Sequence, residues 1–129
     1  LKALQAALKN DPKNERIYYN LALLNNEMNN KAEAENNFAK AVALNSQNAR
    51  VYYNYGLMLN ANKNYKEAEK VLLKGIAIDQ NAADLYYALT FVYLQSNNFV
   101  KAQQTATTLK QLDPTNPNYQ QLFMQLNLN

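Results

Sequence analysis

Apolar residues recur at steps of three and four along most of the chain, in runs that short polar breaks separate. The first clear run, residues 15–28, places on one face Ile17, Tyr18, Leu21, Leu24 and Met28. This spacing is that of one face of an α-helix. Asn29 and Asn30 end the run, and asparagine tolerates the left-handed backbone with which helices stop. A second apolar run over 31–44 follows, so residues 15–48 predict two antiparallel helices joined by a short turn.

The same pattern returns at a step of thirty-four residues, which is visible in the pairs that begin at Tyr18, Tyr52 and Tyr86 and in Ala34, Ala68 and Ala102. A fixed period of this size indicates one unit copied along the chain, and each copy buries its apolar face by stacking on its neighbours. We therefore expect helix pairs over 15–48, 49–82 and 83–116.

The two ends of the chain match only half a unit each. Residues 1–14 resemble the second helix of a truncated copy, and residues 117–129 resemble a first helix that starts near Pro117. Proline suits the first position of a helix. We expect this last helix to pack backwards as a cap, so that 1–129 is a single repeat domain. Because the chain begins at Leu1 inside a helical pattern, we also expect it to be a piece of a longer protein.

Composition agrees with a helical repeat and removes several classes of partner. The 129 residues are 48% hydrophobic, with two glycines and three prolines, which favours helices over a turn-rich β fold. The net charge of +3 is spread among mixed signs without the basic stripe that nucleic-acid binding needs. No apolar run approaches the length of a membrane span. We interpret the 22 asparagines as composition bias, because regular apolar spacing interrupts them.

Side-chain chemistry for catalysis is sparse. The chain has no histidine and no cysteine, which excludes disulfides and thiolate metal sites and leaves carboxylates, lysines and tyrosines as bases. The closest acid pairs, Glu33/Glu35 and Glu67/Glu69, are two residues apart and do not face each other on a helix. There is no glycine-rich phosphate loop and no metal-ligand spacing. We predict a non-catalytic chain without a cofactor, and the compartment stays open between cytoplasm and periplasm.

The pattern of the second copy resembles the tetratricopeptide repeat, whose consensus runs W-x2-L-G-x2-Y, then A-x3-F, then P. The matching residues are Tyr52, Tyr55, Gly56, Leu59, Ala68 and Leu72. Departures elsewhere include Asn25 for an aromatic residue, Thr90 for the small residue and Ala106 for an aromatic residue. The resemblance implies an all-α, right-handed superhelical solenoid of antiparallel helix pairs, in which the first helix of each pair lines a concave groove.

The resemblance also implies which side chains line that groove. Carried onto this sequence, the main groove positions are Arg16, Tyr19, Asn20, Leu23, Arg50, Tyr53, Asn54, Leu57, Asp84, Tyr87 and Phe91. A wider set adds Asn26, Glu27, Asn60, Ala61, Ala88, Leu94 and Gln95. The arginines are suited to acidic groups.

Two ladders run through these positions. One consists of Tyr19, Tyr53 and Tyr87, and the other of Asn20 and Asn54, whose amides match the backbone of an extended peptide. Duplication alone would also make such ladders. For the tyrosines we favour binding, because aromatic residues are enriched among interface anchors; for the asparagines both interpretations stay open.

One specialised mode of binding in the family is not expected. The carboxylate clamp, which holds the acidic tails of chaperones, needs lysine and asparagine in the first groove helix and two more basic residues in the third. Tyr19 and Leu23 occupy the former places here, and Asp84 and Ala88 occupy the latter. Only Asn54 matches.

The function that these observations predict is protein–protein interaction, with a peptide or protein segment held in the concave groove. The alternative is a structural arm that self-assembles into a homo-oligomer, or docks on another domain of the same polypeptide, through its terminal repeat edges. Leu1, Leu4 and Leu8 favour this alternative, because the half unit that carries them lacks a partner helix and an exposed apolar edge invites association.

Overall fold

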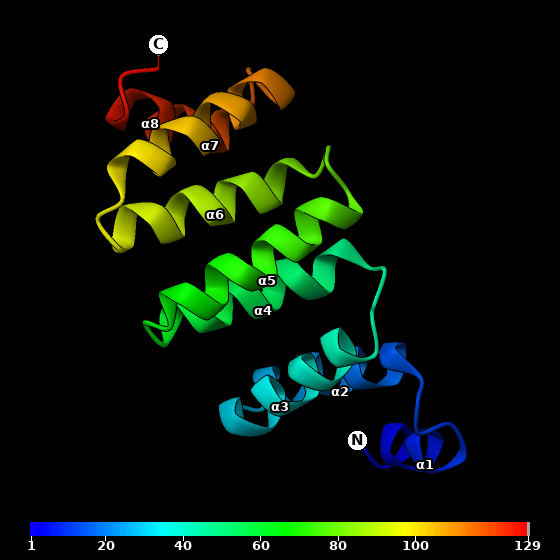
Figure 1. Ribbon diagram of the computed structural model, residues 1–129. Coiled ribbons are helices and arrows are strands. Elements are labelled where there is room, and N and C mark those ends of the chain that lie inside the picture. Colours follow the sequence, from blue (N-terminus) through cyan, green and yellow to red (C-terminus); the bar gives the residue numbers. More distant parts are fainter. Residues whose placement is uncertain (129) are drawn as a thin grey trace. The chain divides into compact units, whose positions relative to one another are not determined.

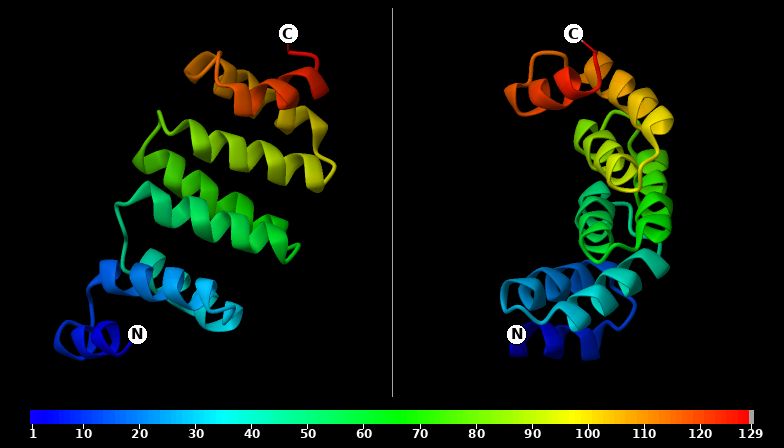
Figure 2. Two further views of the ribbon diagram at one scale, coloured as in Figure 1. Left: turned by 180° about the vertical axis from the view of Figure 1, so that it is seen from behind. Right: turned by 90° about the vertical axis from the view of Figure 1, so that its left-hand side faces the viewer.

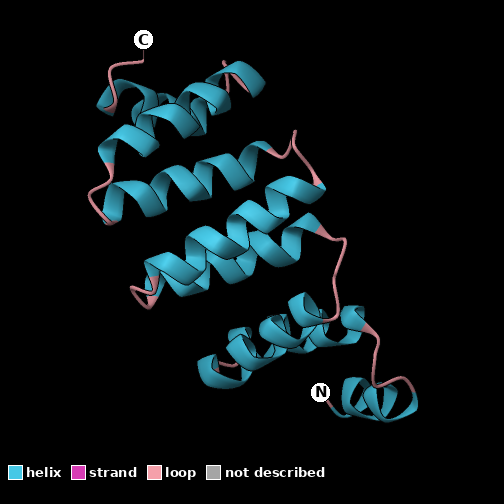
Figure 3. Ribbon diagram, in the orientation of Figure 1, coloured by secondary structure: helices cyan, strands magenta, loops and turns pink. Residues whose placement is uncertain are grey.

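The computed structural model describes residues 1–128, and over this range the chain is helical without any strand (Figures 1 and 3). The predicted all-α fold is thereby confirmed. The helices are α1 (Lys2–Asn10), α2 (Glu15–Glu27), α3 (Lys31–Ala43), α4 (Ala49–Ala61), α5 (Tyr65–Ile78), α6 (Ala83–Gln95), α7 (Phe99–Leu112) and α8 (Pro117–Gln125). They form two compact units, one over residues 1–51 and the other from Tyr52 onward.

The first unit is built on the pair α2 and α3, with α1 packed against α2. Ala22 and Ala34 are fully buried, and small side chains of this kind allow two helices to approach closely. Phe38 fills the core beside them with 1% of its surface exposed. Asn25, which stands where the consensus has an aromatic residue, is also buried, and its side-chain amide donates to the Leu21 carbonyl at 2.9 Å. The substitution is tolerated because this polar group is hydrogen-bonded.

The second unit contains α4 from Tyr52 onward and α5 to α8. In the right-hand view of Figure 2, α4, α6 and α8 lie on one side of this unit, and α5 and α7 on the other. Its core is formed by fully buried side chains, the largest of which are Phe123, Leu72, Leu85, Leu89 and Leu109. The first helices of successive pairs thus form one layer and the second helices another.

Both glycines lie at close contacts between helices. A Cβ atom on Gly56 would lie 2.5 Å from Cδ2 of Leu72, and one on Gly75 would lie 2.7 Å from Cβ of Tyr52. Glycine in a helix interior normally lowers stability relative to alanine. Here the close approach of the neighbouring helix explains both residues.

Asparagine ends several of the helices, as expected at Asn29, whose φ is 64°. Asn45, Asn97 and Asn127 have the same left-handed backbone. After α2, the amide of Asn30 donates to the carbonyl of Asn25 at 2.8 Å, which is the bond that closes a Schellman motif. These asparagines therefore have a structural role beyond composition bias.

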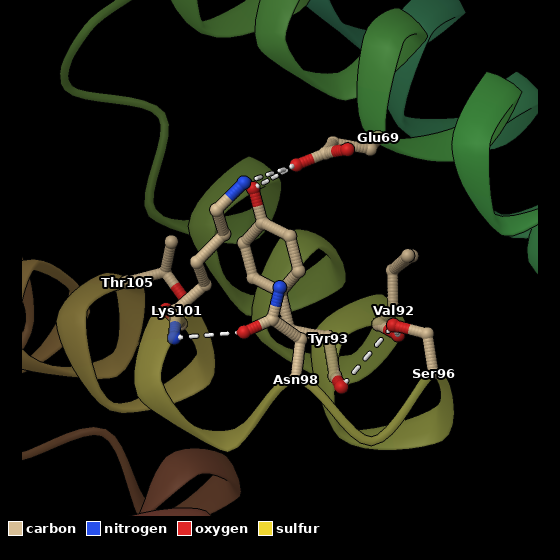
Figure 4. A network of polar contacts seen from close by, with 7 residues as sticks. All are labelled: Glu69, Val92, Tyr93, Ser96, Asn98, Lys101 and Thr105. Carbon is tan, nitrogen blue, oxygen red and sulfur yellow. Dashed lines mark hydrogen bonds and ion pairs between the residues drawn. The ribbon is translucent and has the colours of Figure 1, made fainter.

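A polar network joins α5, α6 and α7 in the second unit (Figure 4). The phenol of Tyr93 donates to a Glu69 carboxylate oxygen at 2.6 Å, and the Lys101 ammonium group lies 3.5 Å from the same oxygen. Burial and the hydrogen bond to Glu69 raise the pKa of the Tyr93 phenol. The phenol therefore stays protonated and keeps its donor role.

Candidate functional site

The second unit contains a groove between α6 and α8, with a cavity volume of about 390 Å³. We call it the α6–α8 groove, and its eight lining residues are Tyr87, Phe91, Leu94, Gln95, Asn118, Gln121, Leu122 and Gln125. Four of them are apolar or aromatic and four carry a carboxamide. None of these lining residues is charged.

The wall on α6 arises because this helix is apolar on nearly every side. Leu85, Leu89 and Val92 are buried in the core, which leaves other apolar residues of α6 at the groove. Tyr87 is half-buried and Phe91 has 38% of its surface exposed. Since residues four apart share a helix face, these two rings lie along the same wall.

The wall on α8 is held in place by the N-terminal cap of the helix and by the side chain that the helix buries in the core. Asn116 caps the helix, because its side-chain oxygen accepts the Asn118 amide at 2.9 Å. Phe123 is 1% exposed and anchors the helix in the core. The carboxamides of Asn118, Gln121 and Gln125 follow the spacing of a single helix face and so reach the groove together.

Aromatic stacking attaches α8 to α6. The rings of Tyr87 and Tyr119 stack with centroids 5.0 Å apart and planes inclined by 29°, and Tyr119 meets Phe123 edge-on at 6.4 Å. Burial, with the nearby charges of Asp84 and Asp113, raises the pKa of Tyr119. Tyr87 therefore takes part in packing as well as lining the groove.

Gln95 is held from the neighbouring helix α4. Asn60 is only 5% exposed, and its side-chain amide donates to Oε1 of Gln95 at 3.3 Å. The Oδ1 atom of Asn60 is buried and has no hydrogen-bond partner. The Gln95 carboxamide is consequently oriented by a residue that does not itself line the groove.

The groove residues expected from the sequence are distributed over both units. The first unit holds Arg16, Tyr19, Asn20, Leu23 and Arg50, and the second holds Tyr53, Asn54, Leu57, Asp84, Tyr87 and Phe91. The α6–α8 groove brings together Tyr87 and Phe91, with Leu94 and Gln95 of the wider set. Tyr53, Asn54 and Leu57 are half-buried on α4, outside that lining. Ala88 is fully buried.

Four of the lining residues lie on α8, which the sequence predicts only as a cap and not as a groove wall. They are Asn118, Gln121, Leu122 and Gln125. Their spacing matches one face of a first helix in the repeat, and this was the signal that would have identified them.

The described residues offer little to other classes of site. Residues 1–128 contain no group of three or more acidic, histidine or cysteine side chains that could hold a metal ion. Over the same range, no helix has the length and apolar character needed to cross a membrane.

Comparison with known proteins gives the same fold. Two tetratricopeptide repeat models match the chain, over residues 61–125 and 26–83. No curated protein matches it in sequence.

Among solved structures, pilF of Pseudomonas aeruginosa is similar with a TM-score of 0.78 and 28% identity, over 89% of this chain and 53% of that one. MamA is similar with a TM-score of 0.83 and 24% identity, over 98% of this chain and 77% of that one. YrrB, described as a TPR protein with an unusual peptide-binding site, has a TM-score of 0.74 and 25% identity, over 87% of this chain and 58% of that one. This chain thus spans about half the length of pilF, at 53%. With a family model that matches residues 61–125, the chain belongs to the tetratricopeptide repeat family.

Proposed function

We propose that this chain is a non-catalytic interaction module and that the α6–α8 groove holds a peptide or protein segment. The observation that carries the proposal is the groove of about 390 Å³, in which an exposed aromatic ring lies among four carboxamides. Ligand pockets in proteins commonly measure about 300–1,000 Å³ and combine apolar walls with a few polar groups. The peptide-binding site named for YrrB supports the same type of ligand.

The energetic centre of the proposed site is Phe91. A large aromatic side chain that is 38% exposed gains contact area when a guest covers it, and such residues are enriched among the anchors of interfaces. The surrounding carboxamides each donate and accept hydrogen bonds, so they can satisfy the polar groups of a guest as it loses water.

The proposal extends to the residues that the family resemblance assigns to the groove on earlier helices. Tyr53 and Asn54 belong to the same unit as the α6–α8 groove and lie half-buried on α4. Replacing both with alanine should leave the helix content intact and abolish capture of the partner. Equal recovery of the partner by the double variant would remove α4 from the site.

A matched pair of phenylalanines tests the main proposal. Peptides would be selected from a random ten-residue display library on the immobilised chain and then measured against Phe91→Ala and Phe99→Ala. Phe99 is 58% exposed on α7 and does not line the groove. We expect Phe91→Ala to weaken binding about tenfold or more, as loss of an interface anchor does, and Phe99→Ala to leave it unchanged. Failure to select any peptide, or equal effects of the two variants, would contradict the proposal.

Self-association is a second candidate function, and one observation favours it. Phe99 and Val100 are neighbours at the start of α7 with 58% and 70% of their surface exposed. Large apolar side chains that are this exposed can be covered by a second copy. Light scattering over a range of concentrations tests this candidate, since a constant monomer mass would eliminate it. Loss of a dimer in the double variant Phe99→Ser/Val100→Ser would support it.

A further inference from the structure

The charge of the α6–α8 groove restricts its guest. All eight lining residues are uncharged, and the polar half consists of carboxamides alone, from Gln95, Asn118, Gln121 and Gln125. A charged guest side chain would lose water on entry without meeting a counter-charge on the lining, which is unfavourable. A carboxamide lining instead matches neutral polar groups, which it can serve as donor and acceptor.

The conformation of the guest follows from the same lining. A helical peptide satisfies its own backbone amides and carbonyls, whereas an extended peptide leaves them available. Four carboxamides along one groove supply the partners that an extended backbone needs. The apolar half of the lining, which includes Phe91 and Leu122, provides a seat for one apolar side chain of the guest.

Asn60 gives the groove a defined donor. Its amide donates to Oε1 of Gln95 at 3.3 Å, which turns Oε1 toward α4 and leaves both N–H groups of Nε2 for a guest. Asn60 is only 5% exposed, so its side chain is fixed by the surrounding core while it makes this bond. The donor of this bond lies on α4 and its acceptor on α6, so the bond fixes Gln95 from outside the groove lining. The one visible bond of Asn60 indicates a positioning role toward Gln95.

We propose that the α6–α8 groove selects an uncharged, extended peptide segment, with one apolar side chain against Phe91 and Leu122 and one backbone carbonyl bonded to Nε2 of Gln95. Asn60 is the positioning residue that fixes the orientation of Gln95. This inference rests on the proposed function of the groove and adds the class of ligand that it takes.

Three peptide pools test the selectivity. All peptides are eight residues long, carry a fluorescein label and contain one Leu or Phe. In the uncharged pool the other residues are Asn, Gln, Ser and Thr. In the two charged pools, three of these are replaced with Asp or with Lys. We expect fluorescence polarisation to show binding of the uncharged pool at least tenfold tighter than that of either charged pool. Tighter binding of a charged pool that Phe91→Ala abolishes would overturn the selectivity and leave the groove function standing. Binding of no pool would overturn both.

Variants of the two amides test the positioning role. Gln95→Glu keeps an acceptor for Asn60 but removes the donor, so we expect binding of the uncharged pool to weaken about 3- to 10-fold, the value of one hydrogen bond. Gln104→Glu, on the exposed face of α7 outside the groove, introduces the same charge and should change nothing. Unchanged binding by Gln95→Glu would overturn the role of Gln95.

Asn60→Leu separates positioning from stability. The variant removes the bond to Gln95 together with the unpartnered Oδ1 atom, so we expect the urea midpoint to stay equal or rise while binding of the uncharged pool weakens about threefold. Unchanged binding in a folded Asn60→Leu chain would refute the positioning role. If this variant fails to fold, Asn60→Ala, which removes the same bond with a smaller side chain, replaces it, and unchanged binding by Asn60→Ala would equally refute the positioning role.

Discussion

The helix pairs α4–α5 and α6–α7 differ in which helix carries the larger side chain at one pair of equivalent buried positions. In α4–α5 it is the second helix, and in α6–α7 it is the first. In α4–α5, Gly56 gives room to Leu72, whose Cδ2 would lie 2.5 Å from a Cβ at position 56. Thirty-four residues later, Thr90 replaces the glycine and Ala106 replaces the leucine. Thr90 and Ala106 are both fully buried. The larger residue of this pair of positions has thus moved from the second helix to the first.

The exchange also adds a polar link to the later pair. The Thr90 hydroxyl donates to the Tyr86 carbonyl at 2.7 Å, and its oxygen lies 2.7 Å from Oγ1 of Thr105 on α7. The residue equivalent to Thr105 in α5 is Val71, which has no hydroxyl. Successive copies thus keep the positions of Gly56 and Leu72 buried while they change which groups meet across the helix pair.

The largest loss of stability is expected when α4 receives the threonine of α6 while Leu72 on α5 is kept. Gly56→Thr places a branched side chain against Leu72 in a closed core, and we expect it to lower the free energy of unfolding by about 3 kcal/mol, the upper end of overpacking. Urea denaturation followed by circular dichroism measures this change.

The compensating variant Gly56→Thr/Leu72→Ala checks the reason. Leu72→Ala alone should cost about 2–5 kcal/mol because it leaves a cavity. If the two helices exchange bulk as proposed, the double variant should be less destabilised than the sum of the two single variants by about 1–3 kcal/mol. Simple additivity would show that the two residues are not coupled.

A second comparison is between Gly75 on α5 and its equivalent Ala41 on α3. Gly75→Ala would bring a Cβ to 2.7 Å from Cβ of Tyr52, so we expect a loss of about 2 kcal/mol despite the better helix propensity of alanine. Ala41→Gly should cost only about 0.5–1 kcal/mol. Thermal unfolding measures the stability of both variants. A higher melting temperature for Gly75→Ala than for the parent chain would contradict this account.

The hydrogen bond from Tyr93 on α6 to Glu69 on α5 has no counterpart in α4, because the equivalent residue there is Leu59. Removing the Tyr93 hydroxyl therefore measures what this bond contributes. Tyr93→Phe should lower the free energy of unfolding by about 1.5 kcal/mol at neutral pH, as for a hydrogen bond to a charged group. The folded-state pKa of Tyr93 is raised above its ordinary value of 10.0. This contribution is therefore full below about pH 10 and falls as the pH rises further, when the unfolded chain loses its proton first.

The pH dependence provides the control for this variant. The parent chain should lose more stability between pH 9 and 11 than Tyr93→Phe does, in urea titrations at each pH. Parallel curves for the two proteins would show that the Tyr93 phenol does not titrate differently on folding.

The smallest effect is expected in the turns. Lys63 has a φ of 62° after α4, where the equivalent residue after α6 is Asn97 with a φ of 63°. Because asparagine adopts this backbone more readily, Lys63→Asn should stabilise the chain by about 0.5 kcal/mol, and Asn97→Lys should destabilise it by a similar amount. Differential scanning calorimetry can measure the change in melting temperature of both variants. A lower melting temperature for Lys63→Asn would contradict the argument from the left-handed backbone.

Much of the fold was open to prediction from local patterns. The recurrence of Tyr18, Tyr52 and Tyr86 predicts the helix pairs, and Asn29 marks where the first helix of the first pair stops. In the turn after α4, the left-handed residue is Lys63 and not one of the asparagines beside it. The residue directly after the helix C-cap takes the left-handed backbone, whichever amino acid stands there. The length of the helix therefore overrides the preference of asparagine for this conformation.

By itself the sequence determined the repeated helices, their buried faces and the family, because these depend on spacing within one helix and on a fixed period. Tertiary structure alone decided that Thr90 meets Thr105, that Tyr119 stacks on Tyr87, and that α8 supplies half of a groove. It also decided the contact between Asn60 and Gln95, which lie thirty-five residues apart. Such contacts depend on the distance and angle between neighbouring helices, and these are fixed only when the side chains of both helices pack together.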